Sequence, residues 1–209
     1  MKQIKLLTWI ALLGVLLIGG TALAGQNGNR TASDQQTLSA IEAENLVFLR
    51  EEEKLARDVY LYLFDEWGQW IFENIAASEQ KHMDAVKNLL DTYNLADPAA
   101  GNAAGVFTDP QLQELYNTLI SEGSESNWRA LHVGATIEDM DIFDLQDFLA
   151  QTKKTDVTRV LENLMTGSRN HLRAFVGQME LLGKTYDAQY LDQNEIDAIV
   201  DSPREIGSY

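Results

Sequence analysis

Apolar side chains recur every three or four residues along most of this chain, which is the spacing of an amphipathic helix. No segment shows the alternation that is typical of a strand. Four long segments carry the helical pattern, and their approximate ranges are 39–67, 70–94, 126–151 and 156–182. Only short turns join the first segment to the second and the third to the fourth. Each of these two pairs is therefore expected to pack antiparallel.

A longer connection joins the second long helix to the third. Residues 99–107 are rich in Gly and Ala and are expected to form a loop. Asp109 and Pro110 then indicate the start of a short helix, because Asp caps a first turn and Pro suits its first position. That helix is expected to end near Gly123. The chain is therefore predicted to be all-α, a four-helix bundle with a short extra helix in the crossover between helices two and three.

The bundle is expected to occupy residues 39–183, with Gly183 ending its last helix. Residues 184–209 follow as a tail, which has room for one small helix over about 194–200. No internal repeat at the period of a solenoid protein is present.

The first 24 residues differ from the rest of the chain. Two lysines precede an apolar run over residues 6–18, and the small residues Ala-Leu-Ala stand at 22–24. This order predicts a secretory signal peptide over 1–24, since the run is short for a membrane span. The polar residues 25–38 are expected to form a flexible leader. The mature protein is then exported to a periplasmic or extracellular location, without stable membrane insertion.

Composition narrows the chemistry further. The formal net charge of -16 repels phosphate backbones, so nucleic acid is not an expected partner. The chain has no cysteine, which excludes disulfides, thiolate metal sites and a lipid anchor on cysteine.

Several ionisable residues fall on the apolar stripes, where an unpaired charge is costly to bury. In the first long helix Glu53 lies at the centre of the stripe, Glu52 is a weaker alternative, and Glu51 is expected to face outward. In the second helix Glu79 and His82 form Glu-x-x-His on the stripe.

The third and fourth long helices repeat this anomaly. Glu138 lies on the third stripe with Asp141 one turn along, and His171 lies on the fourth. Glu162 falls on the outer face, about 180° from His171, and is a poor ligand candidate. Ser168 stands three residues before His171, where a second Glu-x-x-His motif would carry its glutamate.

A single buried histidine or glutamate is more often satisfied by a hydrogen bond or an arginine than by a metal. Acid or imidazole near mid-length in all four helices is harder to explain separately, and one cation would neutralise several carboxylates at once. Oxygen and imidazole ligands without thiolate suit iron or manganese, with zinc also compatible. The number of carboxylates is compatible with either one or two metal ions.

The run Glu53 to Tyr60 (EKLARDVY) and the run Glu79 to His82 (EQKH) resemble helix motifs of the ferritin-like superfamily, which holds two irons between four helices. The runs 50–60 and 167–175 more closely resemble the family called domain of unknown function 2202. The resemblance implies a ferritin-like fold. It also implies the metal ligands Glu53, Glu79, His82, Glu138 and His171.

Ser168 departs from the superfamily pattern, and Asp141 is a candidate for the carboxylate that is missing there. Tyr60 lies on the face of Glu53 and is a candidate hydrogen-bond donor to a ligand carboxylate. A packing role for Tyr60 is an equal alternative.

Three functions remain open from the sequence. The first is a di-iron or di-manganese oxidoreductase acting on oxygen or peroxide, supplied by an external electron donor. The second is a non-catalytic protein that binds or sequesters metal outside the cytoplasm. The third is a structural acidic bundle, and the sequence leaves homo-oligomerisation open.

Overall fold

A computed structural model describes residues 37–206 of the chain. The expected signal peptide and residues 25–36 of the expected leader lie outside this range. Within it the chain forms six helices and no strand, so the predicted all-α class is confirmed. The helices are α1 (Ala40–Trp67), α2 (Trp70–Thr92), α3 (Pro110–Gly123), α4 (Asn127–Gln151), α5 (Thr155–Leu181) and α6 (Gln193–Val200). No helix of the described range is long and apolar enough to cross a membrane.

Local sequence explains where these helices begin and end. Ser39 and Glu42 form a capping box at the start of α1. Gly68 ends α1 with φ of 65°, a left-handed conformation that suits glycine. Asp109 accepts hydrogen bonds from the first turn of α3, and Ser126 does the same for α4. The predicted boundaries therefore agree with the structure to within two residues.

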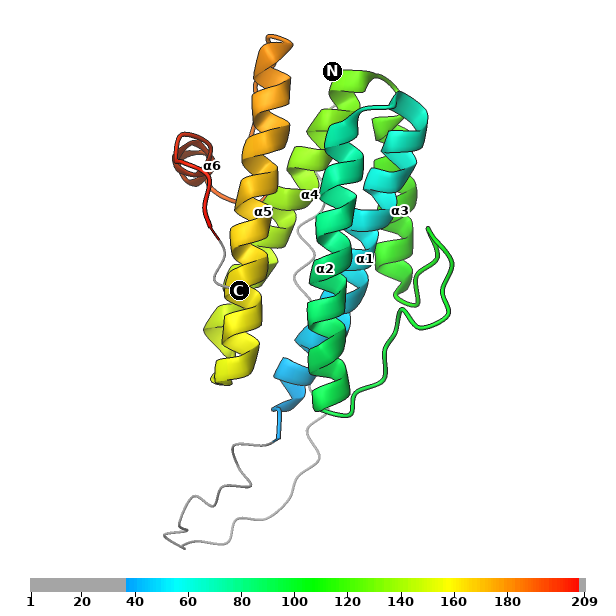
Figure 1. Cartoon of the computed structure of the whole chain (residues 1–209), viewed down its shortest axis with the longest axis vertical. Helices are drawn as coiled ribbons and strands as arrows, with labels where there is room; N and C mark the ends of the chain where they lie inside the picture. The colour runs from blue at the N-terminus through cyan, green and yellow to red at the C-terminus, as the bar shows by residue number, and fades with distance from the viewer. Residues whose placement is uncertain (1–36, 207–209) are drawn as a thin grey trace, which may run out of the picture.

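The four long helices pack as two antiparallel pairs (Figure 1). The most extensive contacts are between α1 and α2 and between α4 and α5. α1 also contacts α4, and α2 also contacts α5, which closes the bundle. α3 packs against α1 and α4, and α6 packs against α5. The apolar stripes meet in one core that runs through the four long helices.

The crossover between α2 and α3 is tied to one face of α1. Arg50 forms two hydrogen bonds with Asp97, of 3.0 and 3.1 Å. Glu51 does not face outward as expected. It is 2 % exposed and accepts hydrogen bonds from the backbone N–H groups of Thr108 (2.6 Å) and Asp109 (2.8 Å). A carboxylate is favourable there because the start of a helix carries partial positive charge.

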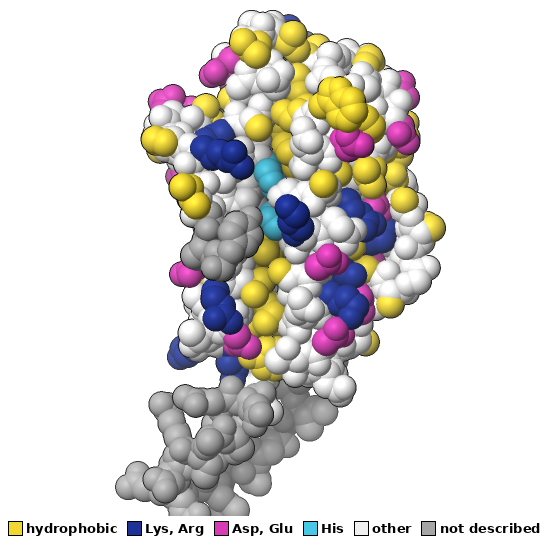
Figure 2. All heavy atoms as spheres, in the orientation of Figure 1, with side chains coloured by type: hydrophobic (Ala, Val, Ile, Leu, Met, Phe, Trp, Pro, Cys, Tyr) yellow, Lys and Arg dark blue, Asp and Glu magenta, His cyan; other side chains and the backbone are white. Residues whose placement is uncertain are grey.

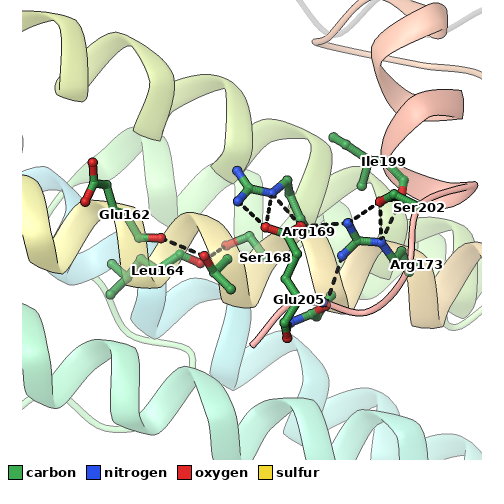
Figure 3. Close-up of polar contacts among 10 residues, drawn as sticks. Glu162, Leu164, Ser168, Arg169, Arg173, Ile199, Ser202 and Glu205 are labelled. Carbon is green, nitrogen blue, oxygen red and sulfur yellow. Dashed lines mark hydrogen bonds and ion pairs between the residues drawn. The ribbon is translucent and has the colours of Figure 1, made fainter. Parts of the chain in front are cut away.

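The segment after α6 is bound to the outer face of α5. The guanidinium groups of Arg169 and Arg173 both pair with the Glu205 carboxylate (Figure 3). Asn170 accepts a hydrogen bond from the backbone N–H of Glu205, at 2.9 Å. Arg173 also donates to Ser202 and to the Ile199 carbonyl. Arg169 and Arg173, the arginines nearest His171 in the sequence, therefore point to the surface of the bundle and not into its interior.

Candidate metal centre

The six predicted ligand residues come from all four long helices, near the middle of each. All are at most 9 % exposed, so the expected burial of these ionisable groups is observed. They are Glu53 of α1, Glu79 and His82 of α2, Glu138 and Asp141 of α4, and His171 of α5. Glu162 is exposed, in agreement with its predicted place on the outer face.

Glu79 lies between the two histidines. Its Oε2 is 2.7 Å from Nδ1 of His82, and its Oε1 is 2.7 Å from Nδ1 of His171. Glu53 approaches the first imidazole, with Oε2 3.2 Å from Nδ1 of His82. Glu138 approaches the second, with Oε2 3.5 Å from Nδ1 of His171.

These residues form two groups that could each hold a metal ion. One consists of Glu53, Glu79 and His82, and the other of Glu79, Glu138 and His171. In each group the ligand atoms lie within 4.8 Å of one another. Glu79 belongs to both groups, which makes its carboxylate the link between them.

The short contacts pair Glu79 with both histidines, but they lack the alignment of a good hydrogen bond. Its Oε1 and Nδ1 of His171 are buried and 2.7 Å apart, yet neither atom has a hydrogen-bond partner. The ring nitrogen of His82 has its hydrogen-bond contact with Glu53, although Glu79 is nearer. Such atoms converge without pointing at one another, because a hydrogen bond needs alignment as well as proximity. Convergent, unpaired donor atoms are what a bound cation requires.

The carboxylates and imidazoles of the centre shift one another's pKa values. Burial raises the pKa of Glu53 to about 7, although His82 beside it acts in the opposite direction. Burial also raises the pKa of Glu79, but His171 and His82 lower it further, so that it lies below its usual value. Burial lowers the pKa of His171, and the carboxylates of Glu79 and Glu138 raise it to about 10. Protons on the imidazoles thus compensate Glu79 when no metal is bound, and a cation would displace them.

Asp141 lies beside the two groups and belongs to neither. Its Oδ2 accepts the hydroxyl hydrogen of Ser168, and its Oδ1 is buried without a partner. Burial and the negative charges of Glu53 and Glu138 raise the pKa of Asp141 well above its usual value. It is therefore held next to the centre with one carboxylate oxygen free.

The Tyr60 hydroxyl donates a hydrogen bond of 2.5 Å to Oε1 of Glu138. Its ring is fully buried and packs against Phe72 and Phe175, with ring centroids 6.4 and 5.2 Å away. The two roles considered from the sequence, donor and packing residue, are thus combined in one side chain. The bond leaves the other oxygen of Glu138 facing His171.

Sequence reasoning did not assign roles to two small residues that shape the centre. A Cβ atom on Gly167 would lie 2.5 Å from Nε2 of His82, so only glycine leaves room for that ring. The Ser78 hydroxyl lies 3.0 Å from Nε2 of His171. The Gly-Ser pair in the middle of a long helix, three and four residues before His171, was the available signal for Gly167.

The two imidazoles form the outer wall of the centre. Their rings stack with centroids 5.6 Å apart, and each side chain is 11 % exposed. Figure 2 shows histidine side chains at the surface in the seam between α2 and α5. The Nδ1 atoms face the carboxylates, whereas Nε2 of His82 lies against Gly167 of α5 and Nε2 of His171 lies against Ser78 of α2.

One protein is similar to this chain both in sequence and in structure. The chain is 50% identical over 173 residues to Uncharacterized protein MJ0754 of Methanocaldococcus jannaschii, which covers 83% of this chain and 94% of that protein. A crystal structure of hypothetical protein MJ0754 from Methanococcus jannaschii DSM 2661 matches with a TM-score of 0.80 and 47% identity. That match covers 88% of this chain and 100% of the other.

The family model described as Uncharacterized protein domain (DUF2202) matches residues 42–203, a range that includes every candidate ligand. The resemblance stated from the sequence is thereby confirmed at the level of this family. The chain belongs to the DUF2202 family.

Proposed function

We propose that the protein binds two divalent metal ions in the core of a ferritin-like bundle, with Glu79 bridging them. The observation that carries this proposal is the position of Glu79, whose two oxygens each face a different histidine at 2.7 Å. One ion would be held by Glu53, Glu79 and His82. The other would be held by Glu79, Glu138 and His171.

Charge balance supports two ions over one. Glu53, Glu79, Glu138 and Asp141 are buried carboxylates, and their charges would be matched by two divalent cations with neutral imidazoles. Buried carboxylates without such compensation would be strongly destabilising. The oxygen-rich ligands with one imidazole for each ion favour iron, with manganese or zinc compatible.

The arrangement favours redox chemistry on a small oxidant such as oxygen or peroxide. Ser168 stands where a second bridging glutamate would complete a symmetric site. Its hydroxyl is bonded to Asp141, and a set of three residues for each ion would leave room for a small substrate. Iron in such a site supplies electron transfer to the oxidant, and the chain's own groups bind and orient the ions. Electrons would come from an external donor.

Metal analysis of purified protein tests the two-ion centre. Protein reconstituted with Fe²⁺ without oxygen is expected to retain about two ions per chain after desalting. Glu79→Gln and His82→Ala should lower that number, while Glu162→Gln, on the exposed face of α5, should not. Unchanged iron content in both ligand variants would rule out the proposed centre.

Turnover separates an oxidoreductase from a protein that only sequesters metal. The reduced iron form should consume many equivalents of peroxide or oxygen when a chemical reductant is supplied in excess. Consumption that stops at the amount needed to oxidise the bound iron once would favour sequestration.

We further propose that the protein acts outside the cytoplasm, on the basis of the signal-peptide pattern in residues 1–24. Expression of the full chain in a bacterial host, followed by fractionation and N-terminal sequencing, tests this. A new terminus at Gly25 in the exported fraction is expected. Full-length protein retained in the cytoplasm would contradict it.

A further inference from the structure

The chain that follows α5 is attached to the bundle at two places. This C-terminal segment, residues 184–206, includes α6, which packs against α5 (Figure 1). One attachment is at Asp139 of α4, the sequence neighbour of Glu138, and the other is on the turn of α5 that carries His171. Both attachments are therefore next to ligands of the same proposed ion. This is the ion held by Glu79, Glu138 and His171, which we call the His171 ion.

Asp139 is fully buried, and the C-terminal segment supplies hydrogen-bond donors to its carboxylate. Its Oδ2 accepts hydrogen bonds from the Tyr186 hydroxyl at 2.8 Å and from the backbone N–H of Gln189 at 2.7 Å. Its Oδ1 accepts one from the backbone N–H of Leu191 at 2.9 Å. A buried carboxylate without such donors is strongly destabilising, so α4 and this part of the segment hold each other in place.

Glu205 attaches the far end of the segment to α5 (Figure 3). The guanidinium groups of Arg169 and Arg173 both pair with its carboxylate. The Asn170 side chain donates to the Glu205 carbonyl at 3.0 Å and accepts from the Glu205 N–H at 2.9 Å. Arg173 also donates to the Ile199 carbonyl at 2.7 Å. Charge-assisted bonds from a planar guanidinium fix the orientation of the two partners as well as their distance.

The contacts of Glu205 hold the outer side of the turn whose inner side carries His171. Arg169 and Arg173, two residues before and two after His171, lie about 160° around the helix from it. The rotation of α5 about its axis decides how Nδ1 of His171 meets Glu79 of α2, and metal sites tolerate only about 10–20° of misorientation. α5 contacts α2 much less extensively than it contacts α4, so a restraint on this turn acts directly on that approach.

The other proposed ion has no comparable support from the C-terminal segment. This ion, which we call the His82 ion, has Glu53 of α1 and His82 of α2 among its ligands. Within residues 37–206, the hydrogen bonds and ion pairs that join the segment to the four long helices go to α4 and α5. We therefore expect a weakened attachment to affect the two ions differently.

We propose that residues 184–206 form a clamp that sets the affinity of the His171 ion, with Glu205 as its positioning residue. The effect on this ion rests on the proposed function, whereas the grip on the turn that carries His171 does not. Coupling between two sites is reciprocal, so binding of the ion also tightens the attachment of the clamp. Detachment of the clamp would release the His171 ion in preference to the His82 ion.

Hydrogen exchange of the metal-free protein tests the grip. Glu205→Gln keeps the size of the side chain and removes its charge, so its bonds with Arg169 and Arg173 weaken. The backbone amides of residues 169–173 are expected to exchange about tenfold faster in this variant. Exchange within twofold of the unmodified protein would overturn the clamp.

Two backgrounds with one ligand removed isolate each ion. Protein with His82→Ala keeps the ligands of the His171 ion, and protein with His171→Ala keeps those of the His82 ion. Competitive titration with Mn²⁺ and a chelator then measures each affinity with and without Glu205→Gln. The variant is expected to weaken the His171 ion about tenfold and to leave the His82 ion within about twofold. A general loss of stability would not produce a change confined to one ion.

Glu195→Gln is the matched control, because it alters another carboxylate of the same segment. Glu195 of α6 accepts a hydrogen bond from Gln146, which lies about two turns along α4 from Glu138. This variant should leave the exchange of residues 169–173 and both affinities unchanged. Thermal midpoints of the two variants check that each is folded.

The outcomes separate the clamp from the proposed function. Equal weakening of both ions by Glu205→Gln would overturn the clamp, and so would the absence of weakening at either ion. If the unmodified protein bound no Mn²⁺, the proposed function would fall, while faster exchange of residues 169–173 in Glu205→Gln would still support the grip. Saturating Mn²⁺ should also slow exchange of the backbone amides in residues 199–205, and exchange there that does not respond to metal would contradict the coupling.

Discussion

Ser168 of α5 donates its hydroxyl hydrogen to the carboxylate of Asp141 on α4, across the core of the bundle. Ser168 stands three residues before His171, at the position that holds a glutamate in bundles with two Glu-x-x-His motifs. A serine offers no carboxylate at this position. The neighbouring helix α4 places the carboxylate of Asp141 there instead. Asp141 belongs to α4, and its link to α5 is the hydrogen bond from Ser168.

Ser168→Ala tests this relationship. Without the hydroxyl, Asp141 loses the hydrogen bond that orients it. We expect the affinity of the more weakly bound of the two ions to fall about tenfold. Competitive titration of metal-free protein with Mn²⁺ and a chelator measures the change. Thr166→Ala, whose hydroxyl bonds only the Glu162 carbonyl on the outside of α5, should leave both affinities unchanged. Equal affinities in Ser168→Ala and the unmodified protein would show that Asp141 needs no such support.

Gly167→Ala should damage the metal centre without unfolding the protein. The added Cβ would lie 2.5 Å from Nε2 of His82 and force that ring to move. The ion bound by Glu53, Glu79 and His82 is then expected to bind at least tenfold more weakly. Elemental analysis after dialysis against a chelator measures its loss.

Gly177→Ala is the control for that experiment, because no atom lies within 4 Å of the added methyl group. It replaces a glycine of the same helix and should raise stability by about 0.5–1 kcal/mol through helix propensity alone. If Gly167→Ala behaved like Gly177→Ala, retaining both ions, the close approach to His82 would have no functional importance.

The metal-free protein should lose stability as pH rises from about 5 to about 9. The folded pKa of His171 is raised from 6.5 to about 10, so its contribution is complete below pH 6.5 and is lost as pH approaches 10. The pKa of Glu53 is raised from 4.5 to about 7 by burial, so a cost appears as this group ionises above pH 4.5. Both changes act in the same direction.

Bound metal should reverse this dependence, because cations compete with protons for the same atoms. Thermal midpoints of metal-free and Mn²⁺-loaded protein, measured from pH 5 to pH 8, check both statements. The difference between the two forms should grow with pH. A difference that is constant over this range would mean that the added metal binds somewhere other than these carboxylates and imidazoles.

The helices and their boundaries followed from the sequence because their causes are local. Ser39, Gly68, Asp109 and Gly183 act within one turn of their own positions, and the apolar spacing repeats over many residues. The burial of Glu53, Glu79 and His171 followed for the same reason. Each lies on a stripe whose direction is set by its own helix.

What the sequence missed depends on contacts between distant segments. Glu51 was expected in solvent, and its burial depends on the crossover segment at Thr108 and Asp109 crossing that face of α1. The sharing of Glu79 between two histidines depends on how α2 and α5 are rotated against each other. Helical periodicity gives the face of a residue but not the partner helix that meets it.

Tyr60→Phe should weaken one side of the centre more than the other. The Tyr60 hydroxyl is 2.5 Å from Oε1 of Glu138, and its removal leaves that buried oxygen without its donor. We expect a loss of about 1–3 kcal/mol in stability without metal. Affinity should fall by about 10–100-fold for the ion held by Glu138 and His171.

Tyr93→Phe provides the matched control, because its hydroxyl donates to Asp156 at the end of the bundle, at 2.8 and 2.9 Å, away from the ligands. Chemical denaturation and metal titration of both variants separate the two effects. Tyr93→Phe should lower stability slightly and bind both ions normally. Tyr60→Phe should leave the ion at Glu53 and His82 close to its original affinity, because Tyr60 contacts neither residue. A uniform loss at both ions would instead show that Tyr60 supports the packing of the whole core and has no particular role in placing Glu138.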